Sequence, residues 1–242
     1  MNLIIDIGNT FIKAALFDQG QEPVEVFTFK HDDKGAIKKL FQYDVTACLI
    51  SSVTEIPNEI RTLTKSISKT FFLEENQVIY PIKNNYETPE TLGSDRLANA
   101  CAAAHSFQDE NVLVIDMGTC IKYDLVDKSG VYQGGSISAG IRMRYEALHE
   151  KTGKLPLLDT EFSESPLGKT TDQALHTGVM HAILFEMKGF VSFYKDSFNP
   201  LKVILTGGDA FYFEKLLKNS IFADSFLTLK GLNEILKVNV RK

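Results

Sequence analysis

The sequence lacks several features that would assign it to a broad class. It has no apolar run of the ~18 residues that a membrane-spanning helix requires, and Asp6 interrupts the first apolar stretch where a secretory signal would continue. It has no HExxH and no CxxC motif. Positive charge is not in excess either, since the formal net charge is -5. These absences predict a cytoplasmic protein that binds neither membranes nor nucleic acid and has no histidine-based metal site.

The composition that remains is that of an ordinary globular protein. The chain has 242 residues, 44% hydrophobic and 24% charged, which is enough for one large domain or two small ones. Its three cysteines, Cys48, Cys101 and Cys120, are widely spaced, and we expect them to be small buried apolar residues without chemistry.

Two segments of the chain resemble each other. "LIIDIGNT" at 3–10 and "VLVIDMGT" at 112–119 each place an aspartate and a glycine directly after an apolar run. Allowing one extra residue at Asn9, the alignment pairs Asp6 with Asp116, Gly8 with Gly118, Thr10 with Thr119, Lys13 with Lys122 and Asp18 with Asp127. The sequence therefore predicts an internal duplication, in which each half is an α/β domain that opens on a β-hairpin. We expect the domains to span residues 1–110 and 111–242.

Further strands and helices are predicted from local patterns. Residues 47–53 and 202–208 read as strands. Residues 94–105 carry an apolar stripe at helical spacing, with Ser94 as the expected N-cap, and residues 141–150 form a second amphipathic helix that ends before Gly153.

The two predicted hairpins are suited to binding phosphates. An aspartate at the end of a central strand can hold a hydrated cation, and the following glycine lets backbone N–H groups approach a ligand. Thr10 and Thr119 add hydroxyl groups, and Lys13 adds a positive charge. A plain strand and turn, with Lys13 and Lys122 facing solvent, is the alternative for either segment alone. The repeat favours the phosphate-binding interpretation.

A third motif, "TGGDA" at 206–210, follows the predicted strand that ends the second half. A Gly-Gly pair at such a junction allows close approach to a nucleotide. The order of the three motifs resembles the phosphate-1, phosphate-2 and adenosine motifs of the acetate/sugar kinase, heat-shock chaperone and actin superfamily. This resemblance implies two duplicated ribonuclease H-like domains of the actin-like ATPase type, with a nucleotide cleft between the domains.

One further segment narrows the resemblance. "YETPETLGSDRLANACAAA" at 86–104, together with "DIGNTFIK" and "DMGTC", resembles the signature of type III pantothenate kinases. "GGSISAGIRMR" at 134–144 and "GKTTDQALHTG" at 168–178 also fall where that family has similar segments. The resemblance implies ATP-dependent phosphorylation of pantothenate in the first committed step of coenzyme A synthesis. It also implies Mg²⁺, a monovalent cation (K⁺ or NH₄⁺) and a homodimer.

The resemblance also assigns roles to individual residues. Asp95 is the expected catalytic base, and Asp116 the expected ligand of the monovalent cation. The ATP-binding residues are expected to be Asp6, Ile7, Gly8, Asn9, Thr10, Phe11, Ile12, Lys13 and Thr119. The pantothenate-binding residues are expected to be Tyr86, Gly93, Ser94, Asp95, Arg96 and Thr171.

The residue chemistry agrees with this assignment on the acceptor side. A carboxylate in the first turn of a helix can accept or orient a hydroxyl proton, and the fork of a guanidinium suits a carboxylate or amide of the substrate. The alternative is that Asp95 only complements the helix dipole and that Arg96 is a surface cation. Members of the resembled family usually carry a small residue and a threonine after the second turn and a proline in the "GGxIxPG" segment, where this chain has Cys120, Lys122 and Ala139. We expect none of these three residues to touch a residue to which a chemical role is assigned.

Two other functions fit the same fold. A non-catalytic transcriptional accessory protein would use ATP as a switch ligand, but it would have no use for a base at Asp95. A kinase of a sugar or a small acid would keep the nucleotide site and change the acceptor pocket, where Tyr86, Arg96 and Thr171 instead resemble a pantothenate set.

Overall fold

The computed structural model describes residues 1–75, 77–217 and 221–241. The chain divides into two compact units: Met1–Ser106 with Phe226–Lys242 forms unit 1, and Phe107–Ser225 forms unit 2. Among the described residues, none of the helices combines the length and the apolar character needed to cross a bilayer.

Unit 1 is built on a five-stranded sheet in the order β3-β2-β1-β4-β5. Strands β1, β2 and β3 form an antiparallel meander, and β4 and β5 continue parallel to β1. The strand bounds are β1 Asn2–Ile7, β2 Ile12–Phe17, β3 Glu25–Phe29, β4 Ala47–Ser52 and β5 Lys69–Phe72.

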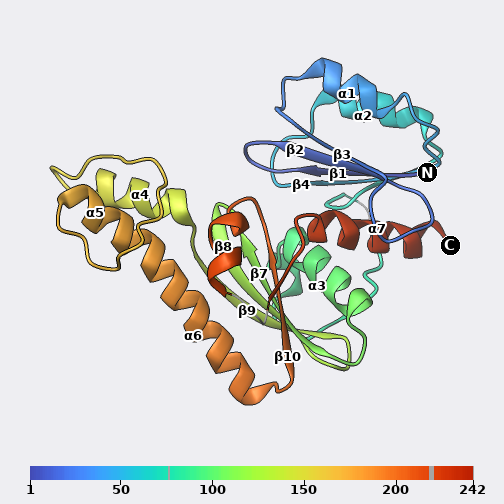
Figure 1. The fold of residues 1–242 in the computed structure, drawn as a ribbon. Coiled ribbons are helices and arrows are strands. Elements are labelled where there is room, and N and C mark those ends of the chain that lie inside the picture. Colours follow the sequence, from blue (N-terminus) through green and yellow to red (C-terminus); the bar gives the residue numbers. More distant parts are fainter. Residues whose placement is uncertain (76, 218–220, 242) are drawn as a thin grey trace. The chain divides into compact units, whose positions relative to one another are not determined.

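Helices cover both faces of this sheet (Figure 1). Alternate residues of β1 point to opposite faces, so that Leu3 and Ile5 pack with α1 (Lys34–Leu40) and α2 (Asn58–Leu63), whereas Ile4 packs with α3 and α7. The latter two helices are α3 Ser94–Ser106 and α7 Leu227–Val240. A strand buried on both faces must be almost wholly apolar, which is why β1 reads as an unbroken hydrophobic run up to Asp6.

Unit 2 repeats this topology. Its strands follow the order β11-β10-β7-β8-β9, with β7, β8 and β9 antiparallel and with β10 and β11 parallel to β7. The strand bounds are β7 Asn111–Met117, β8 Cys120–Val126, β9 Val131–Ala139, β10 Leu201–Thr206 and β11 Ile221–Ala223. The predicted duplication, mixed α/β class and hairpin at the start of each half are therefore confirmed.

The helices of unit 2 are α4 Ile141–Glu150, α5 Thr171–His176 and α6 Ala182–Ser197. Residues of α4 and α6 share one core with β7, β8 and β10. A π-helix, Thr177–His181, joins α5 to α6. Two further 3₁₀ turns of unit 2 are Ala210–Tyr212 and Glu214–Leu217. Unit 1 also contains the short strand β6 Lys83–Asn84 and the 3₁₀ turns Thr64–Ser66 and Pro89–Thr91.

The last helix, α7, belongs to the other unit than the predicted boundary at residue 110 implies. The predicted second domain ran from 111 to 242, whereas α7 belongs to unit 1 because Leu229, Leu232 and Leu236 complete the apolar core beside Ala98 of α3. An apolar stripe shows that a helix packs on something, but not on which sheet.

Most local predictions agree with the structure. The helix predicted at 141–150 is α4, and the strands predicted at 47–53 and 202–208 are β4 and β10, each shorter at its carboxyl end. Ser94 is the first residue of α3 rather than the residue before it. Cys48 and Cys101 are fully buried, and burial raises the pKa of both thiols, whereas Cys120 is half-buried.

Candidate active site

The first hairpin turn follows Asp6 at the carboxyl end of β1. Asp6 lies opposite Lys13 of β2 in the antiparallel register and beside Ser51 of β4 in the parallel one. The turn is closed by the Gly8 N–H, which donates to the Phe11 carbonyl at 3.1 Å. Residues 9–11 are exposed, so their backbone N–H groups and the Thr10 hydroxyl are accessible to a phosphate.

Two of the residues predicted to bind ATP can do so only through their backbone. Ile7 and Ile12 flank the turn as a cross-strand pair, and both side chains are fully buried in the core of unit 1. Their role in this site is to fix the ends of the turn.

The second hairpin turn is the counterpart of the first. The Gly118 N–H donates to the Cys120 carbonyl at 3.1 Å, as Gly8 does to Phe11, and this equivalence places the extra residue in the first turn. Thr119 is exposed at the tip of the turn, and its backbone carbonyl accepts from the Gly140 N–H at 3.1 Å. This bond ties the start of α4 to the turn.

The Gly-Gly loop meets the same end of β7. Gly207 has a φ of +95°, and a Cβ there would lie 2.3 Å from the Met117 carbonyl oxygen, so only glycine fits. The same carbonyl accepts from the Asp209 N–H at 3.1 Å. Desolvation by burial raises the pKa of the Asp209 carboxyl. The motifs "DMGT" and "TGGD", 90 residues apart in sequence, are thus in direct contact within unit 2.

The carboxylate of Asp116 already has a cationic partner. Lys122 lies opposite Asp116 across the β7-β8 ladder, and its Nζ donates to Asp116 Oδ2 at 2.9 Å. The side chains of Lys122 and Asp116 are only 18% and 12% exposed. Asp116 is the expected ligand of the monovalent cation, so the expectation that Lys122 touches no residue with an assigned role is wrong. The alternative that Lys122 faces solvent is wrong as well.

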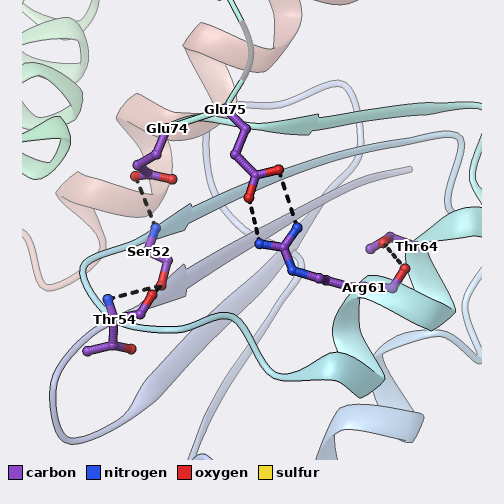
Figure 2. A network of polar contacts seen from close by, with 6 residues as sticks. All are labelled: Ser52, Thr54, Arg61, Thr64, Glu74 and Glu75. Carbon is purple, nitrogen blue, oxygen red and sulfur yellow. Dashed lines mark hydrogen bonds and ion pairs between the residues drawn. The ribbon is translucent and has the colours of Figure 1, made fainter.

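In unit 1, Glu74 links the end of β4 to the start of α3, the helix that carries Asp95. Its Oε1 accepts from the Ser51 hydroxyl at 3.2 Å, from the Ser52 N–H at 3.1 Å and from the Ser94 hydroxyl at 3.2 Å. Figure 2 shows the bond to Ser52. The hydroxyl groups of Ser51 and Ser94 also lie 3.1 Å apart. Because Ser51 is the sheet neighbour of Asp6, this network connects the first turn to α3.

Asp95 projects from the first turn of α3. Its Oδ1 accepts from the Arg96 N–H at 2.8 Å, and it covers Gly93, where a Cβ would lie 2.6 Å from this oxygen. The positive end of the helix dipole lies beside this carboxylate. Such a group can orient a hydroxyl and accept its proton.

Arg96 is not the surface cation of the alternative interpretation. Its side chain is buried, at 4% exposure, and its guanidinium Cζ lies 5.6 Å from the centroid of the Tyr86 ring. The Tyr86 N–H donates to the Asn84 side chain at 2.9 Å, which fixes the segment that carries the ring. The structure thus brings together Tyr86, Gly93, Ser94, Asp95 and Arg96, five of the six residues predicted to bind the acceptor.

The sixth predicted residue, Thr171, lies in unit 2. It is the exposed first residue of α5, where the Thr170 side chain caps the helix by accepting from the Gln173 N–H. Its hydroxyl therefore lies on the surface of unit 2, where a ligand can reach it.

Sequence reasoning missed two sets of supporting residues. One is Glu74, which no motif contains. The other is a partly buried cluster in unit 2, where Glu186 of α6 accepts from Tyr123 at 2.9 Å and from Arg144 at 2.5 Å. Arg144 also donates to the Ala139 carbonyl at 2.8 Å. The "GGSISAGIRMR" segment contains Ala139 and Arg144, and the glutamate that binds the latter lies 42 residues away in sequence.

Comparison with solved structures supports the fold. A Baf-family protein from Campylobacter jejuni, described as a candidate transcriptional activator, matches with a TM-score of 0.62 over 99% of this chain and 100% of its own, at 22% identity. A glucokinase from an Antarctic psychrotroph matches with a TM-score of 0.52 over 98% of both chains, at 11% identity. At these identities the matches establish the shared architecture alone.

Sequence comparison is more specific. The family model described as type III pantothenate kinase matches residues 2–192. Type III pantothenate kinases from Bacteroides fragilis and Phocaeicola vulgatus are each 42% identical over 240 residues, covering 99% of this chain and 98% and 99% of their own. One from Flavobacterium johnsoniae is 41% identical over 97% of this chain and 96% of its own. The chain therefore belongs to the type III pantothenate kinase family.

Proposed function

We propose that this protein transfers the γ-phosphoryl group of ATP to the primary hydroxyl of pantothenate, giving 4'-phosphopantothenate for coenzyme A synthesis. The observation that carries the proposal is the acceptor-side arrangement of Asp95, Arg96 and Tyr86 in a chain that matches this family over its full length. A nucleotide-binding protein without an acceptor has no need of such an arrangement.

In this proposal the two hairpin turns bind the phosphates. The residues from Asp6 to Lys13 present backbone N–H groups, a threonine hydroxyl and an ammonium group, and Thr119 presents a second hydroxyl from unit 2. Mg²⁺, held through Asp6, would neutralise charge on the phosphates. Transfer then depends mainly on positioning and on charge stabilisation by the residues around the phosphates.

Asp95 acts on the acceptor. Its carboxylate accepts a hydrogen bond from the primary hydroxyl of pantothenate, orients the oxygen for attack on the γ-phosphorus and takes up the proton that is released. Arg96 binds the carboxylate or amide of the substrate, with Tyr86 as one wall of the pocket and Thr171 as a further hydrogen-bonding group. Gly93 and Ser94 hold the helix start that presents Asp95.

The monovalent cation implied by the resemblance is a separate question. Asp116 is the residue that would bind it, but the Lys122 ammonium lies 2.9 Å from this carboxylate. The donor set thus does not fit K⁺ or NH₄⁺ as a simple extra ligand of Asp116, and no step above depends on that ion.

The proposal also includes a location and an oligomeric state. We expect a cytoplasmic protein, since that location is consistent with an ATP-dependent kinase of coenzyme A synthesis. We also expect a homodimer, and α6 offers a surface for it: Phe185 and Phe193 are 59% and 64% exposed, and Phe193 lines a shallow apolar cavity with Glu186, Gly189 and Phe190. Phe193→Lys should shift the protein to monomer in analytical ultracentrifugation.

A coupled ADP-release assay tests the function. Purified protein with Mg²⁺-ATP is offered pantothenate, glucose, mannose, acetate or no acceptor. Release of ADP that depends on pantothenate supports the proposal, and mass spectrometry of the product should show one added phosphoryl group. ATP binding without turnover of any acceptor would favour the regulatory alternative, and turnover of a sugar would move the function to another kinase class.

A further inference from the structure

The pair formed by Lys122 and Asp116 is built into the sheet. The two residues are directly opposite on β8 and β7, so their backbone positions are fixed by the ladder. The 2.9 Å distance joins Nζ to Oδ2, and both side chains are more than four-fifths buried. Asp116 is followed directly by Met117 and Gly118, to which the Gly-Gly loop and the turn are hydrogen-bonded.

A buried carboxylate needs a balancing charge. Holding the Asp116 carboxylate away from most of its water is costly unless a cation is close, and the ammonium of Lys122 provides this cation from within the chain. Lysine presents a compact point charge with three N–H donors, and thus closely resembles a bound NH₄⁺ ion in charge and hydrogen bonding.

Free and tethered cations compete for such a position. A second monovalent ion at Asp116 would lie within a few ångströms of Nζ, where two like charges in a weakly screened environment repel strongly. The tethered ammonium also needs no binding equilibrium, because the strand holds it at the carboxylate at a high effective concentration.

We propose that the Lys122 ammonium takes the place of the activating monovalent cation beside Asp116, so that phosphoryl transfer by this chain requires neither K⁺ nor NH₄⁺. This inference rests on the proposed function. The family resemblance implies an activating K⁺ or NH₄⁺ ion, and this inference differs from it because of one residue, Lys122.

The first test uses the unmodified protein. ADP release with Mg²⁺-ATP and pantothenate is measured in KCl, NaCl and choline chloride at equal ionic strength, after removal of residual K⁺ and NH₄⁺. We expect turnover numbers that agree within about 2-fold. A loss of about 10-fold or more in both NaCl and choline chloride would overturn the inference and leave the proposed function intact.

The second test uses Lys122→Thr, which restores a residue type that the resembled family carries after this turn. We expect turnover in choline chloride to fall by about 10-fold or more, and KCl or NH₄Cl to restore it with a saturable dependence. Lys202→Thr is the matched control: Lys202 lies on β10 and pairs with Glu110 at 2.8 Å, so its loss should create no response to K⁺. A Lys122→Thr variant that folds, turns over in KCl and is equally active without K⁺ would contradict the inference.

A melting experiment separates the inference from the function. With Mg²⁺-ATP present, the thermal midpoint of the wild type should be the same in KCl and choline chloride, whereas that of Lys122→Thr should be higher in KCl, because an ion that binds the folded state stabilises it. This readout needs no turnover. If no acceptor is phosphorylated in any salt, the proposed function fails, and the melting data still decide the inference. A K⁺-specific stabilisation of the wild type would overturn it, even if the variant does not fold.

Discussion

Arg96 lies over the face of Tyr86, with 5.6 Å between the guanidinium Cζ and the centroid of the ring. The two residues come from different elements, the loop after β6 and the first turn of α3, and the ring restricts the positions that the guanidinium can occupy. Arg96 is also buried, at 4% exposure, so that the surrounding structure holds its guanidinium beside the ring.

The contact between Arg96 and Tyr86 predicts that loss of the ring weakens binding of the acceptor, pantothenate, and leaves ATP binding unchanged. Replacing Tyr86 by Leu removes the aromatic face, and a cation–π contact of about 0.5–2 kcal/mol corresponds to roughly a 2- to 30-fold change. We expect the KM for pantothenate to rise within this range while the KM for ATP is unchanged. Tyr86→Phe keeps the ring and should behave like the wild type, unless the hydroxyl itself binds the substrate. Equal increases in both KM values would contradict a role in acceptor binding.

Asp95→Asn tests the chemical step. The substitution keeps the size of the side chain but removes the charge that accepts the proton, so turnover should fall by ~10²-fold or more. Binding of Mg²⁺-ATP, measured by calorimetry, should be retained because Asp95 is assigned to the acceptor. Turnover close to that of the wild type at saturating substrates would remove Asp95 from the catalytic role.

Sequence patterns predicted the parts of the site that are local. A strand buried on both faces followed by an aspartate and a glycine is readable without a structure, and its repetition after 110 residues fixed both hairpins. The helix start at Ser94 was readable within one residue for the same reason. In each case the residues that determine the geometry are neighbours along the chain.

Contacts across strands or between distant segments could not be read in this way. The pairing of Lys122 with Asp116 depends on the number of residues in the turn, since a shift of one residue would move the lysine to the other face of the sheet. Glu74 hydrogen-bonds to Ser51, 23 residues before it, and to Ser94, 20 residues after it. Helix α7 belongs to unit 1, although it lies at the far end of the sequence. Neither arrangement leaves a pattern in the sequence.

The Glu74 network gives a prediction about positioning. Glu74→Ala leaves the hydroxyl groups of Ser51 and Ser94 and the Ser52 N–H without their shared acceptor, which should cost about 1–3 kcal/mol in unfolding free energy. Turnover should also fall, because the first turn of α3 carries Asp95.

Glu75 provides the matched control. Figure 2 shows the ion pair of Glu75 with Arg61, whose guanidinium lowers the pKa of the Glu75 carboxyl. Both side chains are at least 40% exposed. Exposed ion pairs contribute little to stability, because water and salt screen them. Glu75→Ala should therefore change urea unfolding and turnover little, and similar losses in the two variants would argue against a special role of Glu74.

Asp6 should couple stability to nucleotide binding. If Asp6 holds the Mg²⁺ of Mg²⁺-ATP, the ligand at 100 times its Kd adds about 2.7 kcal/mol to the wild type, and this gain should shrink in Asp6→Ala. The ligand-free proteins are melted first, so that any change in their own stability is subtracted from the ligand shift. Differential scanning fluorimetry with and without Mg²⁺-ATP measures both effects. An undiminished ligand shift would exclude Asp6 from the phosphate site.

The two glycines of the Gly-Gly loop are expected to have different roles, with Gly207 required for the fold and Gly208 facing the ligand. Gly207→Ala places a Cβ against the Met117 backbone and forces a φ of +95° on alanine, and we expect it to cost about 2–5 kcal/mol in unfolding free energy. Gly208 is exposed, and a Cβ there meets no atom within 4 Å, so Gly208→Ala should leave the stability of the ligand-free protein unchanged or slightly raised. If the loop approaches the adenosine of ATP, Gly208→Ala should still weaken Mg²⁺-ATP binding in calorimetry, because the added methyl group occupies the space that the nucleotide needs. Unchanged ATP affinity in a stable Gly208→Ala protein would remove the Gly-Gly loop from the nucleotide site, and it would leave Gly207 as a residue required only for the packing of β10 against β7.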